Sequence, residues 1–203
     1  FDTIRRTPIN DWHEKNKAEF ENVGQWKRAW YYPINDESMH EAVQRESKAA
    51  RDSAGILDAS TLGKIDIQGS DASEFLNRVY TNAWSKLPIG KCRYGLMLNE
   101  DGMVCDDGVT TRLGENHYIM TTTTGGAANV MGKLEDYLQT EWPELEVYLT
   151  SVTDHFATAS VCGPNSKKIL NKVIPDLDLS DENFPHMSYK NAQIGKIKCR
   201  VMR

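Results

Sequence analysis

The architecture of this chain is best read from one segment, Tyr94-Gly95-Leu96-Met97-Leu98-Asn99-Glu100-Asp101-Gly102-Met103-Val104-Cys105-Asp106-Asp107-Gly108. Residues 94–98 are mostly apolar, and turn-forming residues follow at 99–102. Gly102 can adopt the positive φ that a tight turn requires, and the chain then returns as a second strand-forming run up to Arg112. The segment therefore predicts a β-hairpin over residues 93–112.

Outward from this hairpin, helical and extended patterns alternate along the chain. Apolar residues spaced by three or four positions indicate helices, and alternating or β-branched runs indicate strands. Residues 176–188 read as a polar loop. The expected helices are 39–54, 72–80, 125–139 and a segment after Gly163-Pro164 with Ile169, Leu170 and Val173 facing inward; the expected strands are 64–69, 117–123, 147–152, 156–162 and 194–202.

Local signals predict where two of the helices begin or end. Ser38 with Glu41 three residues later forms a capping box, and Gly55 is the expected C-terminal stop of that helix. Ser70 or Asp71 is expected to cap the next helix. Because helices alternate with hairpins, the expected class is α+β, with mainly antiparallel sheets and packed helices.

The composition is that of a folded, mildly acidic protein. The chain has 203 residues, a net charge of −5, 39% hydrophobic and 26% charged residues. Binding to nucleic acid would need a basic stripe, and a membrane span would need about 18 consecutive apolar residues. Neither nucleic acid nor a membrane is therefore an expected partner.

The cysteines and histidines predict neither disulfides nor a metal site. The four cysteines contain no CxxC pair, which favours reduced thiols and a cytoplasmic location. The five histidines lack the close spacing that zinc ligands show. The start is not that of a signal peptide, and the end at Arg203 falls inside an expected strand, so we expect a piece of a longer chain.

Residues 1–37 are aromatic and read as irregular, and we expect them to form a lead-in packed on a module of residues 38–203. Trp26, Trp30, Tyr31 and Tyr32 either form an interface patch toward another subunit or cover the module's own sheet.

Two adjacent acids, Asp106 and Asp107, stand inside the returning strand of the hairpin. Neighbouring strand residues point to opposite faces, so one acid is directed toward the interior and needs a partner or a ligand there. Spacing alone leaves two readings open. One is a carboxylate that accepts backbone N–H groups at the hairpin, and the other is a functional acid.

The pattern Gly90-x-x-x-Tyr94, followed by residues 98–102 and by Asp106-Asp107, resembles the folate-binding module of the glycine cleavage T-protein (aminomethyltransferase) family. The resemblance extends to Gly55–Ile65 and Ala157–Pro164 in one order. T-proteins usually carry Asn where this chain has Thr123, which favours the branch formed by alpha subunits of heterotetrameric sarcosine oxidase. The segments most similar to that branch are Thr7–Ile9, His13-Glu14, Gly24–Arg28, Trp30–Pro33, Met120–Ala128, Gln139–Pro143 and Thr150–His155.

This resemblance implies a T-protein folate-binding fold that is truncated at the C-terminus, and it implies a reaction. Sarcosine is oxidised at a flavin of the beta subunit, which gives hydrogen peroxide, and the one-carbon unit reaches tetrahydrofolate in this module, which gives glycine and 5,10-methylenetetrahydrofolate. Beta, gamma and delta subunits are the implied partners, and FAD, FMN and NAD belong to the full complex.

The resemblance also implies roles for particular residues. Asp107 matches the family's aspartate beside the folate ring nitrogens, and strand alternation leads us to expect it in a cavity, with Asp106 facing the other way. Tyr94 and Leu62 match positions that pack on folate, although Tyr94 could equally be a core aromatic residue. Thr121 and Thr123 share a strand face at matching positions. The alternatives are a T-protein-like aminomethyltransferase, a folate-dependent demethylase, or a non-catalytic folate-binding scaffold.

Overall fold

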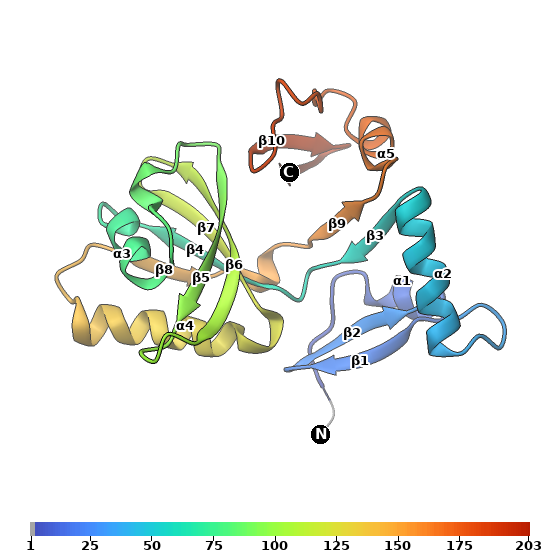
Figure 1. The fold of residues 1–203 in the computed structure, drawn as a ribbon, viewed down its shortest axis with the longest axis horizontal. Coiled ribbons are helices and arrows are strands. Elements are labelled where there is room, and N and C mark those ends of the chain that lie inside the picture. The colour runs from blue at the N-terminus through green and yellow to red at the C-terminus, as the bar shows by residue number, and fades with distance from the viewer. Residues whose placement is uncertain (1–2) are drawn as a thin grey trace. The chain divides into compact units, whose positions relative to one another are not determined.

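A computed structural model describes residues 3–203 and shows an α+β chain whose named strands all pair antiparallel, as predicted (Figure 1). The chain forms two compact units. The first contains the described residues up to Thr61 together with Asp154–Pro175, and the second contains Leu62–Thr153 and Asp176–Arg203. The structure places the residues on both sides of position 37 in the first unit. The domain boundary proposed there stays a prediction.

The first unit is built on two small sheets and three helices. Residues 3–37 are more regular than the sequence suggested, because they include a helix and a hairpin that turns at Gly24, where φ is 57°. Trp26 is buried in this hairpin under the guanidinium of Arg5, whereas Trp30 is half-exposed. The elements are α1 (Asn10–Lys15), β1 (Glu19–Val23), β2 (Trp26–Tyr31), α2 (Met39–Asp52), β3 (Gly55–Asp58), β9 (Ala159–Cys162) and α5 (Ser166–Val173).

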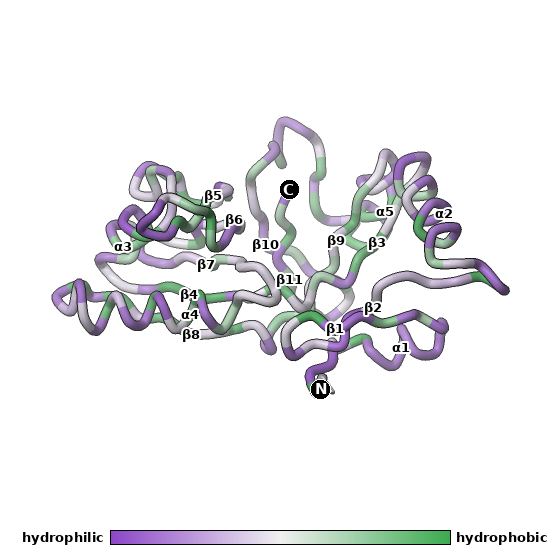
Figure 2. The backbone as a smooth tube through the Cα atoms, turned by 60° about the horizontal axis from the view of Figure 1, so that its bottom comes forward, coloured by the Kyte–Doolittle hydropathy of each residue, from purple (hydrophilic) through white to green (hydrophobic). Residues whose placement is uncertain are grey.

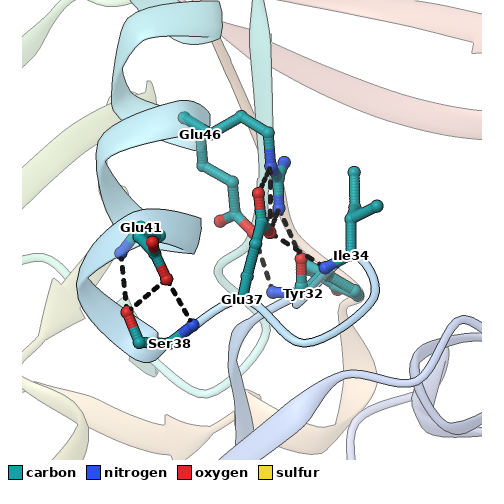
Figure 3. A network of polar contacts seen from close by, with 7 residues as sticks. Tyr32, Ile34, Glu37, Ser38, Glu41 and Glu46 are labelled. Carbon is teal, nitrogen blue, oxygen red and sulfur yellow. Dashed lines mark hydrogen bonds and ion pairs between the residues drawn. The ribbon is translucent and has the colours of Figure 1, made fainter.

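The predicted capping box begins α2, as Figure 3 shows. The Glu41 N–H donates to the Ser38 hydroxyl, and the Glu41 carboxylate accepts from the Ser38 N–H at 2.8 Å. The capping bonds satisfy backbone donors that a helix start otherwise leaves unpaired. The loop before the helix is tied to it by the Tyr32 N–H, which donates to Glu46 of α2, and is closed within itself by the Ile34 N–H, which donates to Glu37 (Figure 3).

Two sequence expectations about the first unit were wrong. The helix α2 ends at Asp52 with Ser53 as its C-cap, so Gly55 is not its stop. Gly55 instead begins β3 close to α2, where an added Cβ would lie 3.0 Å from the Ala50 Cβ. Ile169 and Val173 of α5 are exposed rather than inward, at 41% and 44%.

A buried hydrogen-bond chain links three segments of the first unit. His13 is 2% exposed, its Nε2 lies 2.9 Å from an Asp58 carboxylate oxygen, and its Nδ1 lies 2.6 Å from the Tyr32 hydroxyl. Burial alone would raise the pKa of Asp58, but hydrogen bonds, chiefly from His13 and Ser60, outweigh it and hold that pKa below its ordinary value.

We expect Asp58→Asn to destabilise the protein by about 2 kcal/mol, the usual worth of a hydrogen bond to a charged group. Because the pKa of Asp58 is lower in the folded state, its contribution is present above the unfolded-state pKa and is lost as the pH falls through the folded-state pKa. The variant should therefore lose less stability on acidification than the wild type. Urea unfolding at pH 7 and at about pH 3 measures both effects, because the loss occurs only below the ordinary aspartate pKa of about 3.9. The control is Asp52→Asn, at an exposed carboxylate paired with Lys48, which should change stability by at most about 0.5 kcal/mol. Equal stability of the two variants would contradict the prediction.

The second unit is a five-stranded sheet in the order β5-β6-β7-β4-β8, with α3 and α4 packed on one face. Side chains of β4 and β7, among them Ile65, Ile67 and Met120, form the core with Phe75 and Leu134 of the two helices. In Figure 2 the colour along α4 alternates between purple and green, as expected for a helix with one apolar side. The elements are β4 (Gly63–Gln68), α3 (Ala72–Val79), η1 (Trp84–Lys86), β5 (Cys92–Leu98), β6 (Val104–Gly114), β7 (His117–Thr122), η2 (Thr124–Gly126), α4 (Ala127–Asp136), η3 (Tyr137–Glu141) and β8 (Tyr148–Ser151).

The end of the chain and the cap of α3 also differ from the expectations. Residues 176–188 are not merely a polar loop, since Leu177, Leu179 and Phe184 are buried. The strand expected at 194–202 is present as β11 (Ile197–Met202), but it pairs in a hairpin with β10 (Tyr189–Ile194), which the sequence did not suggest. Asp71 occupies the N-cap of α3, but its carboxylate accepts the Glu146 N–H at 2.8 Å instead of a helix N–H.

Candidate functional site

The two adjacent acids of β6 point to opposite faces of the sheet, as strand alternation predicted. Asp106 is 3% exposed, and Asp107 is exposed. The pairing of β6 with β5 is regular from Asp106 onward, and a β-bulge at Cys105 separates it from the pair Leu98 and Val104. Asp107 was expected to point into a cavity with Asp106 facing the other way; the opposite orientations are confirmed, and the cavity around the exposed Asp107 stays a prediction.

Both carboxylate oxygens of Asp107 accept a hydroxyl hydrogen bond. The Tyr94 hydroxyl of β5 donates to Oδ2 at 2.9 Å, and the Thr123 hydroxyl, just beyond β7, donates to Oδ1 at 3.3 Å. The bond to Asp107 raises the pKa of Tyr94 above its ordinary value, so the phenol keeps its proton at neutral pH. The ring of Tyr94 is 48% exposed, so it is not a core aromatic residue.

Asp106 has two partners inside the core. The Tyr80 hydroxyl donates to its Oδ2 at 2.6 Å, and the backbone N–H of Thr123 donates to its Oδ1 at 3.0 Å. Burial and the neighbouring Asp106 carboxylate raise the pKa of Tyr80 far above its ordinary value, so Tyr80 remains a donor. The sequence indicated that one of the acids needs an internal partner, but nothing in it pointed to Tyr80 or to the Thr123 N–H.

The other two candidate residues are less directly joined to Asp107. The Thr121 hydroxyl accepts the Val109 N–H at 3.0 Å and donates to the Val109 carbonyl at 3.2 Å, so it closes the gap between β6 and β7. Leu62 is half-buried just before β4, and its carbonyl accepts a hydrogen bond from Lys64 Nζ at 3.0 Å. Their predicted contacts with folate stay predictions.

The register of the sheet places the candidate strand residues on the face opposite to α3 and α4. Leu96 pairs with Asp107, and Lys64 pairs with Thr121, while the intervening residues point into the core. Lys64 is a buried cation on this face, at 4% exposure, and sequence reasoning missed it. A basic residue inside the alternating strand 64–69 was the signal that could have found it.

This arrangement offers a fixed acceptor beside an exposed aromatic ring. A carboxylate held by two hydroxyl groups can take a proton or stabilise a nearby positive charge, and the face of Tyr94 can pack on a flat heterocycle. A hollow of about 320 Å³ lies elsewhere, between the hairpin turn and α4, and neither Asp107 nor Tyr94 lines it. Within residues 3–203, the structure contains no group of three or more His, Cys, Asp or Glu side chains placed to hold a metal ion.

Comparisons with known proteins agree with this fold. The model of the GCVT N-terminal domain family matches residues 9–203. The chain is 54% identical, over all of its 203 residues, to a sarcosine oxidase subunit alpha from Corynebacterium sp. (strain U-96), and 49% identical over 195 residues, 96% of the chain, to the subunit alpha from Rhizobium meliloti (strain 1021). The crystal structure of the glycine cleavage system aminomethyltransferase T from Bartonella henselae superposes with a TM-score of 0.78 at 25% identity, over 93% of this chain and 48% of that one.

The chain spans only part of these relatives. It covers 21% and 20% of the lengths of the two sarcosine oxidase subunits. No helix among the described residues has the length and apolar character needed to cross a membrane.

Proposed function

We propose, on the premise that this chain belongs to the GCVT N-terminal domain family, that it is the tetrahydrofolate-binding module of a sarcosine oxidase alpha subunit. The observation that carries the proposal is the carboxylate of Asp107, which is held at both oxygens beside the exposed ring of Tyr94. The identity of about one half to sarcosine oxidase alpha subunits over the whole chain supports the choice of that branch.

The proposed overall reaction is sarcosine, dioxygen and tetrahydrofolate giving glycine, hydrogen peroxide and 5,10-methylenetetrahydrofolate. Tetrahydrofolate, when bound, would supply the amine nitrogens that receive the one-carbon unit. In this module, Tyr94 would pack on the folate ring, and Asp107 would accept the proton released as the amine forms its new bond. Such general-base assistance is typically worth about 10²–10⁴ in rate.

The oxidative step is proposed to occur at a flavin of the beta subunit, with gamma and delta subunits as further partners. FAD, FMN and NAD are the proposed cofactors of that complex, and the cytoplasm is its expected location. A second candidate is a T-protein-like aminomethyltransferase or folate-dependent demethylase, which the structural likeness to aminomethyltransferase T favours. The two candidates differ in the donor of the one-carbon unit.

The test of the proposed function uses the assembled enzyme that contains this module. Sarcosine is supplied with and without tetrahydrofolate, and peroxide, formaldehyde and 5,10-methylenetetrahydrofolate are measured. We expect peroxide to be formed in both conditions and formaldehyde to be replaced by the folate product when tetrahydrofolate is present. Formaldehyde that still equals peroxide at saturating tetrahydrofolate would overturn the proposal, and absence of sarcosine oxidation would favour the aminomethyltransferase alternative.

We also expect the 203-residue chain alone to form no peroxide from sarcosine. The oxidation belongs to a partner subunit in the proposed complex, and this sequence has no GxGxxG dinucleotide fingerprint. A coupled peroxidase assay on the purified chain, with the assembled enzyme as positive control, measures this directly. Peroxide formation that scales with the concentration of the chain would contradict the prediction.

A further inference from the structure

We infer that Asp106 is a positioning residue for Asp107 and that it acts through Thr123. The inference rests on the proposed folate-dependent role of Asp107. Its basis is a continuous set of contacts in which Asp106 binds the backbone of Thr123 and the side chain of Thr123 binds Asp107.

Thr123 lies just beyond the last paired residue of β7. The ladder between β4 and β7 ends at the pair Gly63 and Thr122, and the ladder between β6 and β7 ends at Thr110 and Met120. The N–H of Thr123 therefore has no strand partner in these ladders, and the Asp106 carboxylate accepts it at 3.0 Å. The place of the Thr123 hydroxyl, 3.3 Å from Asp107, thus depends on Asp106.

The Asp106 carboxylate is well suited to hold the backbone of Thr123 in place. It is 3% exposed, and its other oxygen accepts from the Tyr80 hydroxyl, so both of its oxygens are engaged. A buried carboxylate is costly unless it is hydrogen-bonded, which disfavours rotation away from these two donors. One acid of the pair therefore orients the other, although their side chains lie on opposite faces of the strand.

Substitutions at Asp106 and Tyr80 can distinguish a positioning role of Asp106 from a purely structural one. Asp106→Ala removes the acceptor of the Thr123 N–H, whereas Tyr80→Phe leaves that bond in place and only deprives the same carboxylate of its second donor. Asp106→Asn keeps an oxygen that can accept the Thr123 N–H, and its amide can donate to the Tyr80 oxygen. Both Asp106→Ala and Tyr80→Phe disturb the buried network, but only Asp106→Ala releases Thr123.

The experiment measures the ratio of 5,10-methylenetetrahydrofolate to peroxide in the assembled enzyme at saturating tetrahydrofolate. We expect Asp106→Ala to lower this ratio about tenfold, since small displacements of a reacting group can cost up to about 10²-fold. Asp106→Asn should keep the ratio within about twofold of the wild type, and Tyr80→Phe should lower it by no more than about twofold, because in both variants the Thr123 N–H keeps its acceptor. Glu100→Gln, at an exposed acid in the turn of the same hairpin, is the matched control.

If Asp106→Ala does not fold, the double variant Tyr80→Phe with Asp106→Leu replaces both partners by apolar groups of similar size, which can be nearly neutral for stability. It still leaves the Thr123 N–H without its acceptor and should lower the ratio as Asp106→Ala would. A ratio that stays unchanged in these variants, or that falls as far in Asp106→Asn as in Asp106→Ala, overturns the inference.

The outcome also separates this inference from the proposed function. If Asp107→Asn lowers the ratio and Asp106→Ala does not, only the inference fails. If the wild-type enzyme forms no folate product, or if Asp107→Asn leaves the ratio unchanged, the proposed function fails and the inference fails with it.

Discussion

Asp107→Asn in the assembled enzyme is expected to lower the ratio of 5,10-methylenetetrahydrofolate to peroxide at least about tenfold, the low side of general-base effects. Asparagine keeps the size of the side chain and can still accept a hydroxyl hydrogen bond, but it cannot serve as a base. Peroxide formation should persist, because the oxidation is proposed for a distant flavin, and formaldehyde should appear in place of the folate product.

The position of Asp107 makes this test selective. Its side chain is exposed, so loss of the charge should change the free energy of unfolding by no more than about 0.5 kcal/mol. If the Asp107 carboxylate only supported the hairpin, replacing it would instead lower both products together, because less folded enzyme would be present. A ratio equal to that of the wild type and of the Glu100→Gln control would rule out the catalytic role.

Gly108→Ala should destabilise the protein by about 3 kcal/mol, at the upper end of overpacking costs. An added Cβ would lie 1.9 Å from the carbonyl oxygen of Thr121, and this backbone atom cannot move without shifting β7. The close approach of β6 and β7 at Gly108 is also what lets the Thr121 hydroxyl bridge to Val109. Urea unfolding, with the slope m checked for change, measures the loss of stability.

The same chain provides a matched glycine control. Gly132 lies exposed within α4, and an added Cβ there would have no heavy atom within 4 Å. Gly132→Ala should therefore stabilise the protein by about 0.5–1 kcal/mol through helix propensity. Similar unfolding midpoints for Gly108→Ala and the wild type would show that β7 can yield, and would contradict the packing argument.

Elements with a local signal were predictable from the sequence. The hairpin turn at Asn99–Gly102, the capping box at Ser38 and the apolar face of α3 each depend on residues close together in the chain, and the structure confirms all three. The capping of α3 was not predictable, because Asp71 binds the N–H of Glu146, which is 75 residues away.

The parts that sequence patterns missed depend on burial by distant segments. The β1–β2 hairpin was missed because the polar pairs Glu21-Asn22 and Lys27-Arg28 interrupt the alternation on either side of its turn at Gly24. Leu177, Leu179 and Phe184 are spaced within polar residues, so no periodic face marked them as buried. The apolar residues of α5 have helical spacing, but Ile169 and Val173 are exposed. Spacing alone therefore did not indicate which side chains are buried.

The candidate site was predictable in its residues and less so in its geometry. Resemblance to the T-protein family pointed to Tyr94, Asp107 and Thr123, and the structure brings these three side chains together. The internal partner of Asp106 is Tyr80, a residue 26 positions away that sequence spacing could not connect with it.

The β-bulge at Cys105 has a consequence for how this module can vary among related proteins. The paired register runs without a break from Asp106 to Thr111 against Cys92–Met97, and the irregularity lies entirely on the turn side of it. Lengthening or shortening the tip of the hairpin can therefore be absorbed at the bulge, and the phase of the strand at the two acids is preserved. Insertions and deletions should accordingly be tolerated between Leu98 and Cys105, whereas a single inserted residue after Asp106 would exchange the inward and outward positions of everything that follows.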